Sequence, residues 1–147
     1  MRISQILSGK RLDLVSVAPT SSIRTAIALM KREHVGAVLV LDADRRLLGV
    51  LSERDIVHAL DADVPDPFQR PASEVMRRDS PVASAQDSVQ YVMQTMTITR
   101  ARHVPVVELG RVIGIVSIGD IVKSRLDEKN QENTVLQDLA RARAIAK

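Results

Sequence analysis

One short segment of this chain occurs twice, and that duplication constrains the fold more than any other feature of the sequence. The first copy reads Gly-Val-Leu-Ser-Glu-Arg-Asp-Ile-Val at residues 49–57, and the second reads Gly-Ile-Val-Ser-Ile-Gly-Asp-Ile-Val at residues 114–122. Each copy ends an apolar run with Ser-x-x-Asp. Internal similarity of this kind predicts two units with the same local structure.

The repeat also extends upstream of this segment. Apolar residues with the helical spacing i, i+3, i+4, i+7 recur 66 positions apart; they are Ile23, Ala26, Ile27 and Met30 in the first copy and Val89, Val92, Met93 and Met96 in the second. The separation falls to 65 at Gly49 and Gly114, so the second copy is one residue shorter where a hairpin turn is expected. A length change confined to a turn supports a true duplication.

The chain length favours one module rather than two independent domains. A single unit of about 65 residues would bury only a marginal core, so we expect two pseudo-symmetric halves that share one. Apolar residues make up 45% of the chain and the only aromatic ones are Phe68 and Tyr91, which predicts an aliphatic core. The chain has no cysteine, which excludes disulfides and thiolate metal sites. It also lacks an apolar run as long as a membrane span, and we expect a cytoplasmic protein.

Each half is predicted to read strand, helix, strand, strand, helix, which gives a mixed α/β (α+β) fold class. The expected positions in the first half are strands at 12–17, 35–41 and 47–51, a helix capped within 20–22 that runs through Met30, and a second helix from Ser52. The second half has a helix capped by Asp87 or Ser88, a hairpin at 104–107 and 112–116, and a second helix from Ser117. Short helical turns at 4–7 and 73–76 introduce the two repeats.

Proline and charge mark the boundaries of these units. Pro65, Pro67 and Pro71 interrupt both helix and ladder, so the segment 64–71 is predicted to connect the halves. The expected division is one repeat at residues 1–66, the other at 67–127, and a C-terminal helical tail at 128–147. The sparse apolar residues of the tail predict an amphipathic helix that closes over the module or pairs with a second copy; a frayed tail is the alternative.

The duplicated Ser-x-x-Asp has two interpretations. At the start of an apolar helix it is a capping box, in which the hydroxyl accepts from a backbone amide and the acid accepts from the amide of the Ser. Both copies, however, keep Asp where a capping box prefers Glu or Gln, and both place it at a turn with free backbone N–H groups. A short carboxylate there can accept hydrogen bonds from two vicinal hydroxyls, as an acid does with ribose in dinucleotide-binding folds. The pattern therefore predicts a sugar clamp, with helix capping as the alternative.

The sequence resembles the tandem CBS-domain family, in which two cystathionine-beta-synthase-type repeats form one Bateman module. The resemblance covers about residues 3–127 and rests on the two Ser-x-x-Asp segments, on the strand 36–40 and on its counterpart 102–106. It implies that the repeats pack through their small sheets and leave two pseudo-symmetric clefts for adenosine-containing ligands. AMP is the first expectation, with ATP, ADP, NAD(H) or S-adenosylmethionine as further ligands, and the module is expected to form a homodimer.

The resemblance also implies individual ligand contacts. Asp120 with Ser117 would hold the ribose hydroxyls in one cleft, and Asp55 with Ser52 would do so in the other. The resemblance further implies that adenine contacts the backbone of Ala37, Val38, His103 and Val104. Arg102 and His103 would contact the phosphate. Ser16 and Thr20 would line the cleft of Asp120. In the second repeat Val82 occupies the position of Ser16, so the clefts are expected to differ. We expect the cleft of Asp120 to be the better nucleotide site, because it could use Ser16 as well as Arg102 and His103.

The implied function is a regulatory module that binds a nucleotide and signals to a protein partner in trans. A ligand-free dimerisation scaffold is one alternative. Nucleic-acid binding is another, because the net charge is +3, but the basic pairs are dispersed among 18 acidic residues and two aromatic side chains provide no stacking platform. No catalytic or phosphate-loop motif occurs, and His34, His58 and His103 lack metal-ligand spacing; we therefore expect neither an enzyme nor a metal site.

Overall fold

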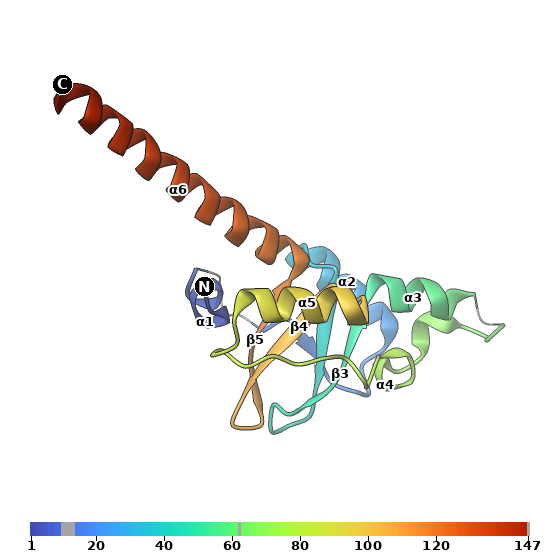
Figure 1. Ribbon diagram of the computed structural model, residues 1–147. Helices are drawn as coiled ribbons and strands as arrows, with labels where there is room; N and C mark the ends of the chain where they lie inside the picture. Colours follow the sequence, from blue (N-terminus) through green and yellow to red (C-terminus); the bar gives the residue numbers. More distant parts are fainter. Residues whose placement is uncertain (10–13, 62, 147) are drawn as a thin grey trace.

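Two similar α/β halves lie side by side in the computed structural model, which describes residues 1–9, 14–61 and 63–146. Figure 1 shows the hairpin of one half beside the hairpin of the other, with helices lying across them and one long helix leaving the body. The predicted mixed α/β class is confirmed. The two halves differ in detail, and those differences follow from the lengths of their first strands and last helices.

The first half contains a three-stranded sheet with strand order β1-β2-β3. Its elements are α1 (Ile3–Ser8), β1 (Ser16–Val17), α2 (Ile23–Glu33), β2 (Ala37–Leu41), β3 (Leu47–Ser52) and α3 (Glu53–Leu60). β1 runs parallel to β2, and β2 runs antiparallel to β3. The side chain of Ser22 accepts a hydrogen bond from the Thr25 amide at 3.2 Å, so α2 starts at one of the predicted caps.

The second half repeats this order with a two-stranded sheet, β4-β5. Its elements are a 3-10 turn η1 (Pro67–Gln69), α4 (Ala72–Val75), α5 (Val89–Thr99), β4 (His103–Glu108), β5 (Arg111–Ser117) and α6 (Ile118–Ala146). Ser88 caps α5 by accepting from the Tyr91 amide at 3.0 Å. Both predicted hairpins and both short helical turns are present at the expected positions.

The first strand of each half is shorter than predicted. Of the strand expected at 12–17, only Ser16 and Val17 pair with β2, while residues 12 and 13 lie outside the described residues. In the second half, the equivalent segment is reduced to a single bridge, in which Ala83 donates to Pro105 and accepts from Val107. The prediction of a first strand in the second half was wrong, because one bridging residue with two backbone hydrogen bonds suffices to attach the chain to β4.

The short opening helices pack across the repeat boundary. The amides of Ile3 and Ser4 donate to the Asp87 and Ala85 carbonyls beside the start of α5, and Ile3 and Leu7 belong to the apolar core of the second half. Reciprocally, α4 is bonded to the start of α2, and its Ala72 lies in the core of the first half. Each half is therefore completed by a helix that precedes the other repeat in the sequence.

A third apolar cluster joins the two halves through their sheets. Its buried members come from β2, β3 and β5; they are Ala37, Leu39, Leu41, Val50 and Val112. Because successive side chains of a strand point to opposite faces, β2 contributes Val38 and Val40 to the first core and Ala37, Leu39 and Leu41 to this shared cluster. The expected packing through the small sheets is confirmed, and it fixes the relative position of the two Ser-x-x-Asp turns.

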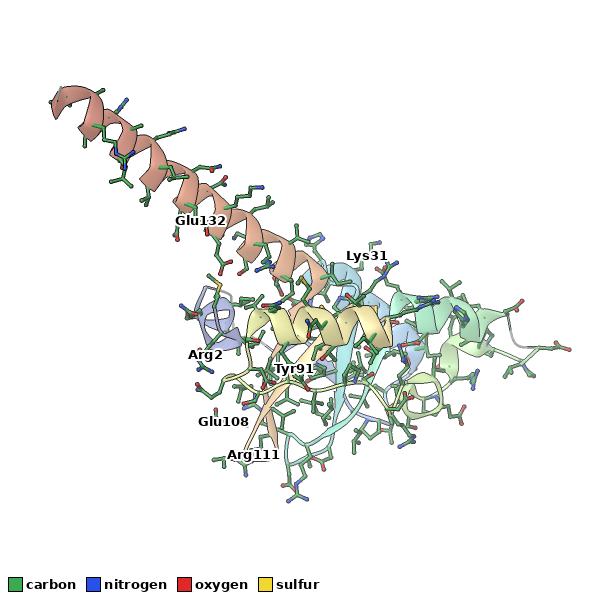
Figure 2. The ribbon with its side chains drawn as sticks, in the orientation of Figure 1. Arg2, Lys31, Tyr91, Glu108, Arg111 and Glu132 are labelled. Atoms are coloured by element: carbon green, nitrogen blue, oxygen red, sulfur yellow. The ribbon has the colours of Figure 1, made fainter. Side chains whose placement is uncertain are left out.

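The helix that follows the second hairpin does not end with the repeat. We expected the helix from Ser117 and a separate C-terminal helix, but α6 is one continuous helix of 29 residues. Figure 2 shows Glu132 on the part of α6 that extends past the body. None of the described helices is long and apolar enough to cross a membrane.

Candidate functional site

Both Ser-x-x-Asp turns form capping boxes at the junction of a strand and a helix. In the first, the Asp55 amide donates to Ser52 Oγ at 3.2 Å, and Asp55 Oδ2 accepts from the Ser52 amide at 3.0 Å. In the second, the Asp120 amide donates to Ser117 Oγ at 3.1 Å, and Asp120 Oδ2 accepts from the Ser117 amide at 2.8 Å. The capping interpretation is thus correct for the structure without ligand. It does not exclude a ligand role, because a carboxylate has about four lone-pair positions to accept hydrogen bonds.

Strand register places the start of each inner strand beside the Ser-x-x-Asp of its own half. Ala37 is paired with Ser52, and His103 is paired with Ser117. One step earlier, the carbonyl of Gly36 accepts from the first amide of α3 at 3.0 Å, and the carbonyl of Arg102 accepts from the first amide of α6 at 2.9 Å. The duplicated segments therefore build two equivalent corners, each with a strand start, a hydroxyl and a carboxylate.

A cleft of about 170 Å³ lies between the halves at the corner of Asp55. The first half contributes Gly36, Val50 and residues 52–55, and the second half contributes Arg77, Ser80 and residues 100–103. Four of these lining residues are arginines (Arg54, Arg77, Arg100 and Arg102), and two are carboxylates (Glu53 and Asp55). The cleft thus combines hydrogen-bond acceptors on one side with an excess of positive charge, which suits a ligand that has both hydroxyl groups and an anionic group.

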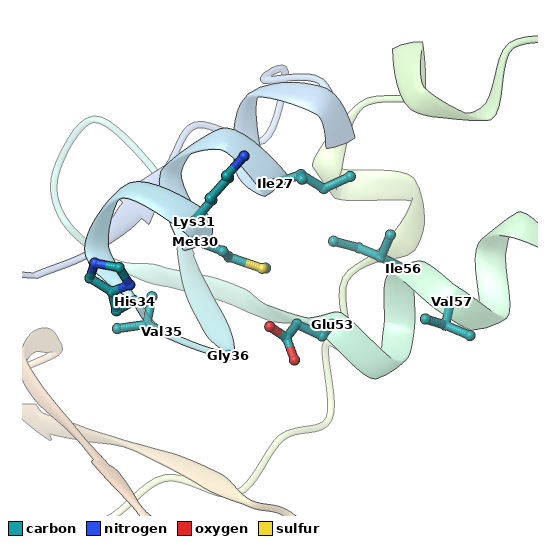
Figure 3. Close-up of a pocket in the computed structure, with 9 residues that line it drawn as sticks. All are labelled: Ile27, Met30, Lys31, His34, Val35, Gly36, Glu53, Ile56 and Val57. Atoms are coloured by element: carbon teal, nitrogen blue, oxygen red, sulfur yellow. The ribbon is translucent and has the colours of Figure 1, made fainter.

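Two further depressions adjoin this cleft. One, of about 650 Å³, lies between α2 and α3, is lined largely by aliphatic side chains such as Met30 and Ile56, and meets the cleft at Gly36 and Glu53. Figure 3 shows Glu53 and Gly36 at one side of it. The other, of about 640 Å³, adds His58 and Arg70 and shares four residues with the cleft: Arg54, Asp55, Arg77 and Arg100.

The structure places several predicted site residues differently from our expectation. We assigned the side chains of Arg102 and His103 to the cleft of Asp120, but both line the cleft of Asp55. A Cβ atom on Gly36 would lie 3.7 Å from Cε1 of His103, so this imidazole lies against the strand start of the first half. The difference arises because the sheets pack face to face, which turns the start of β4 toward the other repeat while its backbone stays beside Ser117.

Other predicted residues lie further from either cleft. Val38 and Val104 are fully buried in the cores, where their backbones belong to the ladders of the hairpins. Ser16 is paired with Leu39 inside the first sheet, and Thr20 is exposed in the turn before α2. Neither Ser16 nor Thr20 lines the described pockets at Asp55 or Asp120.

The corner of Asp120 borders a smaller depression of about 160 Å³ near the N-terminus. Its lining includes Gln5, Gly9, Lys123, Ser124 and Asp127. Residues 10–13, which follow Gly9 directly, lie outside the described residues. Within the described part of the chain, no three His, Asp or Glu side chains come together in a way that would hold a metal ion.

Sequence reasoning missed Arg77, Ser80 and Arg100 as members of the site. Arg77 and Arg100 belong to the basic pairs Arg77-Arg78 and Arg100/Arg102, which the sequence alone does not distinguish from dispersed surface charges. Arg77 is held at the edge of the first sheet, where it donates to and accepts from Val50 at 2.9 and 3.0 Å, and Arg100 follows the last turn of α5. Folding brings these arginines together from segments that are far apart in the sequence, so no local motif could have revealed the cluster.

Comparison with known proteins gives consistent matches over both halves. A family model described as CBS domain matches residues 4–62 and 72–127. A CBS domain-containing protein of Bacillus subtilis is 29% identical over 128 residues, which are 87% of this chain and 90% of the relative. The crystal structure of a CBS-domain containing protein from Agrobacterium tumefaciens is 38% identical, with a TM-score of 0.80, and the match covers 85% of this chain and 99% of that one. A CBS domain protein from Pyrobaculum aerophilum, solved in complex with AMP, is 29% identical with a TM-score of 0.73, over 82% of this chain and 89% of that chain.

Proposed function

Because the chain belongs to the CBS-domain family, we propose that it is a regulatory module that binds an adenosine-containing ligand between its two repeats. AMP is the first candidate ligand, with ADP, ATP, NAD(H) and S-adenosylmethionine as alternatives. The related protein from Pyrobaculum aerophilum was solved with AMP, which supports this ligand class. The proposed role is regulatory rather than catalytic, with a protein target in trans in the cytoplasm.

One observation carries this proposal: a carboxylate at a strand-to-helix corner faces a cluster of arginines across the boundary between the halves. Asp55 Oδ2 is occupied by the capping box, and among the described residues no hydrogen bond reaches its Oδ1. That oxygen is available to accept from the vicinal hydroxyls of ribose, while the arginines, with their fixed forks of donors, suit a phosphate. A ligand bound in this way would contact both halves at once.

Ligand binding is expected to change the packing of the halves. The cleft of about 170 Å³ is smaller than the roughly 300–1,000 Å³ of common small-molecule pockets. Its arginines are exposed, so their side chains can move aside and close on the ligand. Since the cleft is built from both repeats, a ligand that binds one arrangement more tightly shifts the population toward it, and a partner that recognises that arrangement receives the signal.

Self-association is the second candidate function, supported by exposed aliphatic side chains on the helices. Val57 and Leu60 on α3, Ile98 on α5, and Val122 and Leu126 on α6 are between 41% and 82% exposed. Large exposed apolar side chains on the helices of a folded body are candidates for an interface. We propose that the module forms a homodimer through these helices; a scaffold function without ligand would use the same surface.

Calorimetric titration of the full chain with AMP, ATP, NADH and S-adenosylmethionine tests the proposed function. The variants Asp55→Glu and Asp120→Glu serve as probes, because Glu is the usual acid of a capping box and preserves the helix cap, whereas the longer side chain displaces the carboxylate from the ribose. We expect at least one ligand to bind, and one of the two variants to bind it at least about tenfold more weakly with unchanged thermal stability.

The outcomes separate the two candidate functions. Binding that both variants retain would contradict the assigned role of the carboxylates. A folded dimer that binds none of the four ligands, and whose sedimentation none of them alters, would favour the scaffold.

A further inference from the structure

The two clefts come from one duplicated unit, yet their charges differ. Three of the arginines at Asp55 have uncharged or weakly basic counterparts in the other repeat. By the alignment of the repeats, Gly119 corresponds to Arg54, His34 to Arg100, and Gly36 to Arg102. The counterpart of Arg77 is Arg11, which lies outside the described residues. Since duplicated units start identical, the two repeats have diverged in charge at these positions.

Most of these arginines form no ion pair with the described carboxylates. Within the described part of the chain, Arg54, Arg100 and Arg102 take part in no ion pair, although all three side chains are exposed at the same cleft. Arg77 has a distant contact of 4.0 Å with Asp79. Like charges gathered in one place repel one another, and an anion bound among them would relieve that repulsion.

Arg100 also lies in a backbone conformation that favours glycine. Its φ is 57° and its ψ is 26°, and His34, at the same position after α2, has a φ of 55° and a ψ of 45°. Residues other than Gly, Asn and Asp seldom adopt this left-handed backbone conformation. The shared geometry means that His34 and Arg100 can be exchanged without changing the backbone, which provides a matched test of the charge.

We propose that the cleft of Asp55 is the site of a phosphate-bearing adenosine ligand, with Arg54 and Arg100 as the phosphate-binding residues that distinguish it from the cleft of Asp120. This inference rests on the proposed function and reverses our sequence-based preference for Asp120. Asp55 accepts the ribose hydroxyls, and the arginines hold the phosphate oxygens in charge-assisted hydrogen bonds. The adjoining depression, with Arg70 and His58, provides space for a second or third phosphate on the same side of Asp55.

The test compares ligands that differ only in phosphate number. Adenosine, AMP, ADP and ATP are titrated calorimetrically into the full-length protein and into the variants Arg100→His and Arg54→Gln. Arg141→Gln, which removes one exposed arginine from the distant part of α6, is the control for net charge. We expect AMP to bind the natural protein at least about tenfold more tightly than adenosine does. Each cleft variant should bind AMP about tenfold more weakly than the natural protein and should bind adenosine with unchanged affinity. The affinity of the control variant for AMP should also stay unchanged.

Two results would overturn the inference while leaving the proposed function intact. One is equal affinity for adenosine and AMP in the natural protein. The other is AMP binding that Asp120→Glu abolishes but Asp55→Glu and Arg100→His leave unchanged. The Arg141→Gln control could also lose as much affinity for AMP as the cleft variants. The effect would then reflect the net charge of the protein, and the assignment of the phosphate site to the cleft of Asp55 would be wrong. Absence of binding by adenosine, AMP, ADP and ATP also overturns the inference. It refutes the proposed function itself only where NADH and S-adenosylmethionine fail to bind as well.

Discussion

At the scale of single residues, the two glycines of the duplicated segment, Gly49 and Gly114, have different neighbours at the position where a side chain would begin. A Cβ on Gly49 would lie 2.6 Å from Sδ of Met76 and 2.8 Å from the backbone oxygen of Arg77. Among the described residues, the nearest atoms to a Cβ on Gly114 belong to the side chain of Leu7, the closest at 2.8 Å. The Arg77 backbone is fixed by its bonds to Val50. We therefore expect Gly49→Ala to lower the free energy of unfolding by about 1–3 kcal/mol, as measured by urea denaturation.

Gly114→Ala is the matched comparison for this prediction. A leucine side chain can shift to another rotamer at about 1 kcal/mol, and alanine removes about 0.4–1 kcal/mol of unfolded-state entropy, so the two effects nearly cancel. Equal destabilisation by both substitutions would contradict the importance of the Arg77 backbone contact.

At the scale of elements, α1 is a structural part of the second half despite its position at the start of the chain. Ile3 is fully buried against residues of α5 and β5. The substitution Ile3→Ala, which shortens a buried side chain, should lower the free energy of unfolding by about 2–5 kcal/mol, as other large-to-small changes in a core do. Because each half is completed by a helix from the other side of the boundary, we expect a single unfolding transition by circular dichroism and by Tyr91 fluorescence, with no separate melting of the first half.

Ile145→Ala is a suitable control for the effect of Ile3, since Ile145 is 86% exposed on α6 and should change the stability by less than about 0.5 kcal/mol. Two separate transitions in the natural protein would contradict the coupling of the halves by their opening helices.

At the scale of the whole molecule, the extended part of α6 is independent of the folded body. No residue described as buried lies beyond Ser124. Apart from a pair with Arg125 on the same helix at 3.9 Å, Glu128 has a surface contact of 4.0 Å with the N-terminal amine, worth at most about 1 kcal/mol. A chain that ends at residue 127 should therefore keep its melting temperature within about 4 °C, measured by calorimetry. It should also keep its affinity for AMP, because the described cleft residues precede residue 104.

Sedimentation of the same shortened chain reports on the remaining role of the tail. If the truncated protein stays dimeric, the self-association surface is on the body helices, as proposed. A fully monomeric product would instead locate the interface on the tail.

The element order and much of the secondary structure were readable from local patterns. Periodicity located α2, α5 and both hairpins, and Ser22 and Ser88 proved to be the caps of their helices. These features depend on interactions within a few residues, so the sequence contains their full cause. The first strands were less predictable because their length depends on pairing with β2 and β4, which lie more than 20 residues away.

The sequence by itself determined that this protein consists of two related units, each with a Ser-x-x-Asp at a strand-to-helix corner, because duplication and capping are properties of neighbouring residues. Only the tertiary structure decided which residues share a cleft. The face-to-face packing of the two sheets turns Arg102 and His103 toward Asp55, and the edge of the first sheet holds Arg77 beside them. The cleft joins residues up to 67 positions apart, Gly36 and His103 among them, and their pairing is fixed by the apolar cluster between the halves rather than by any local signal.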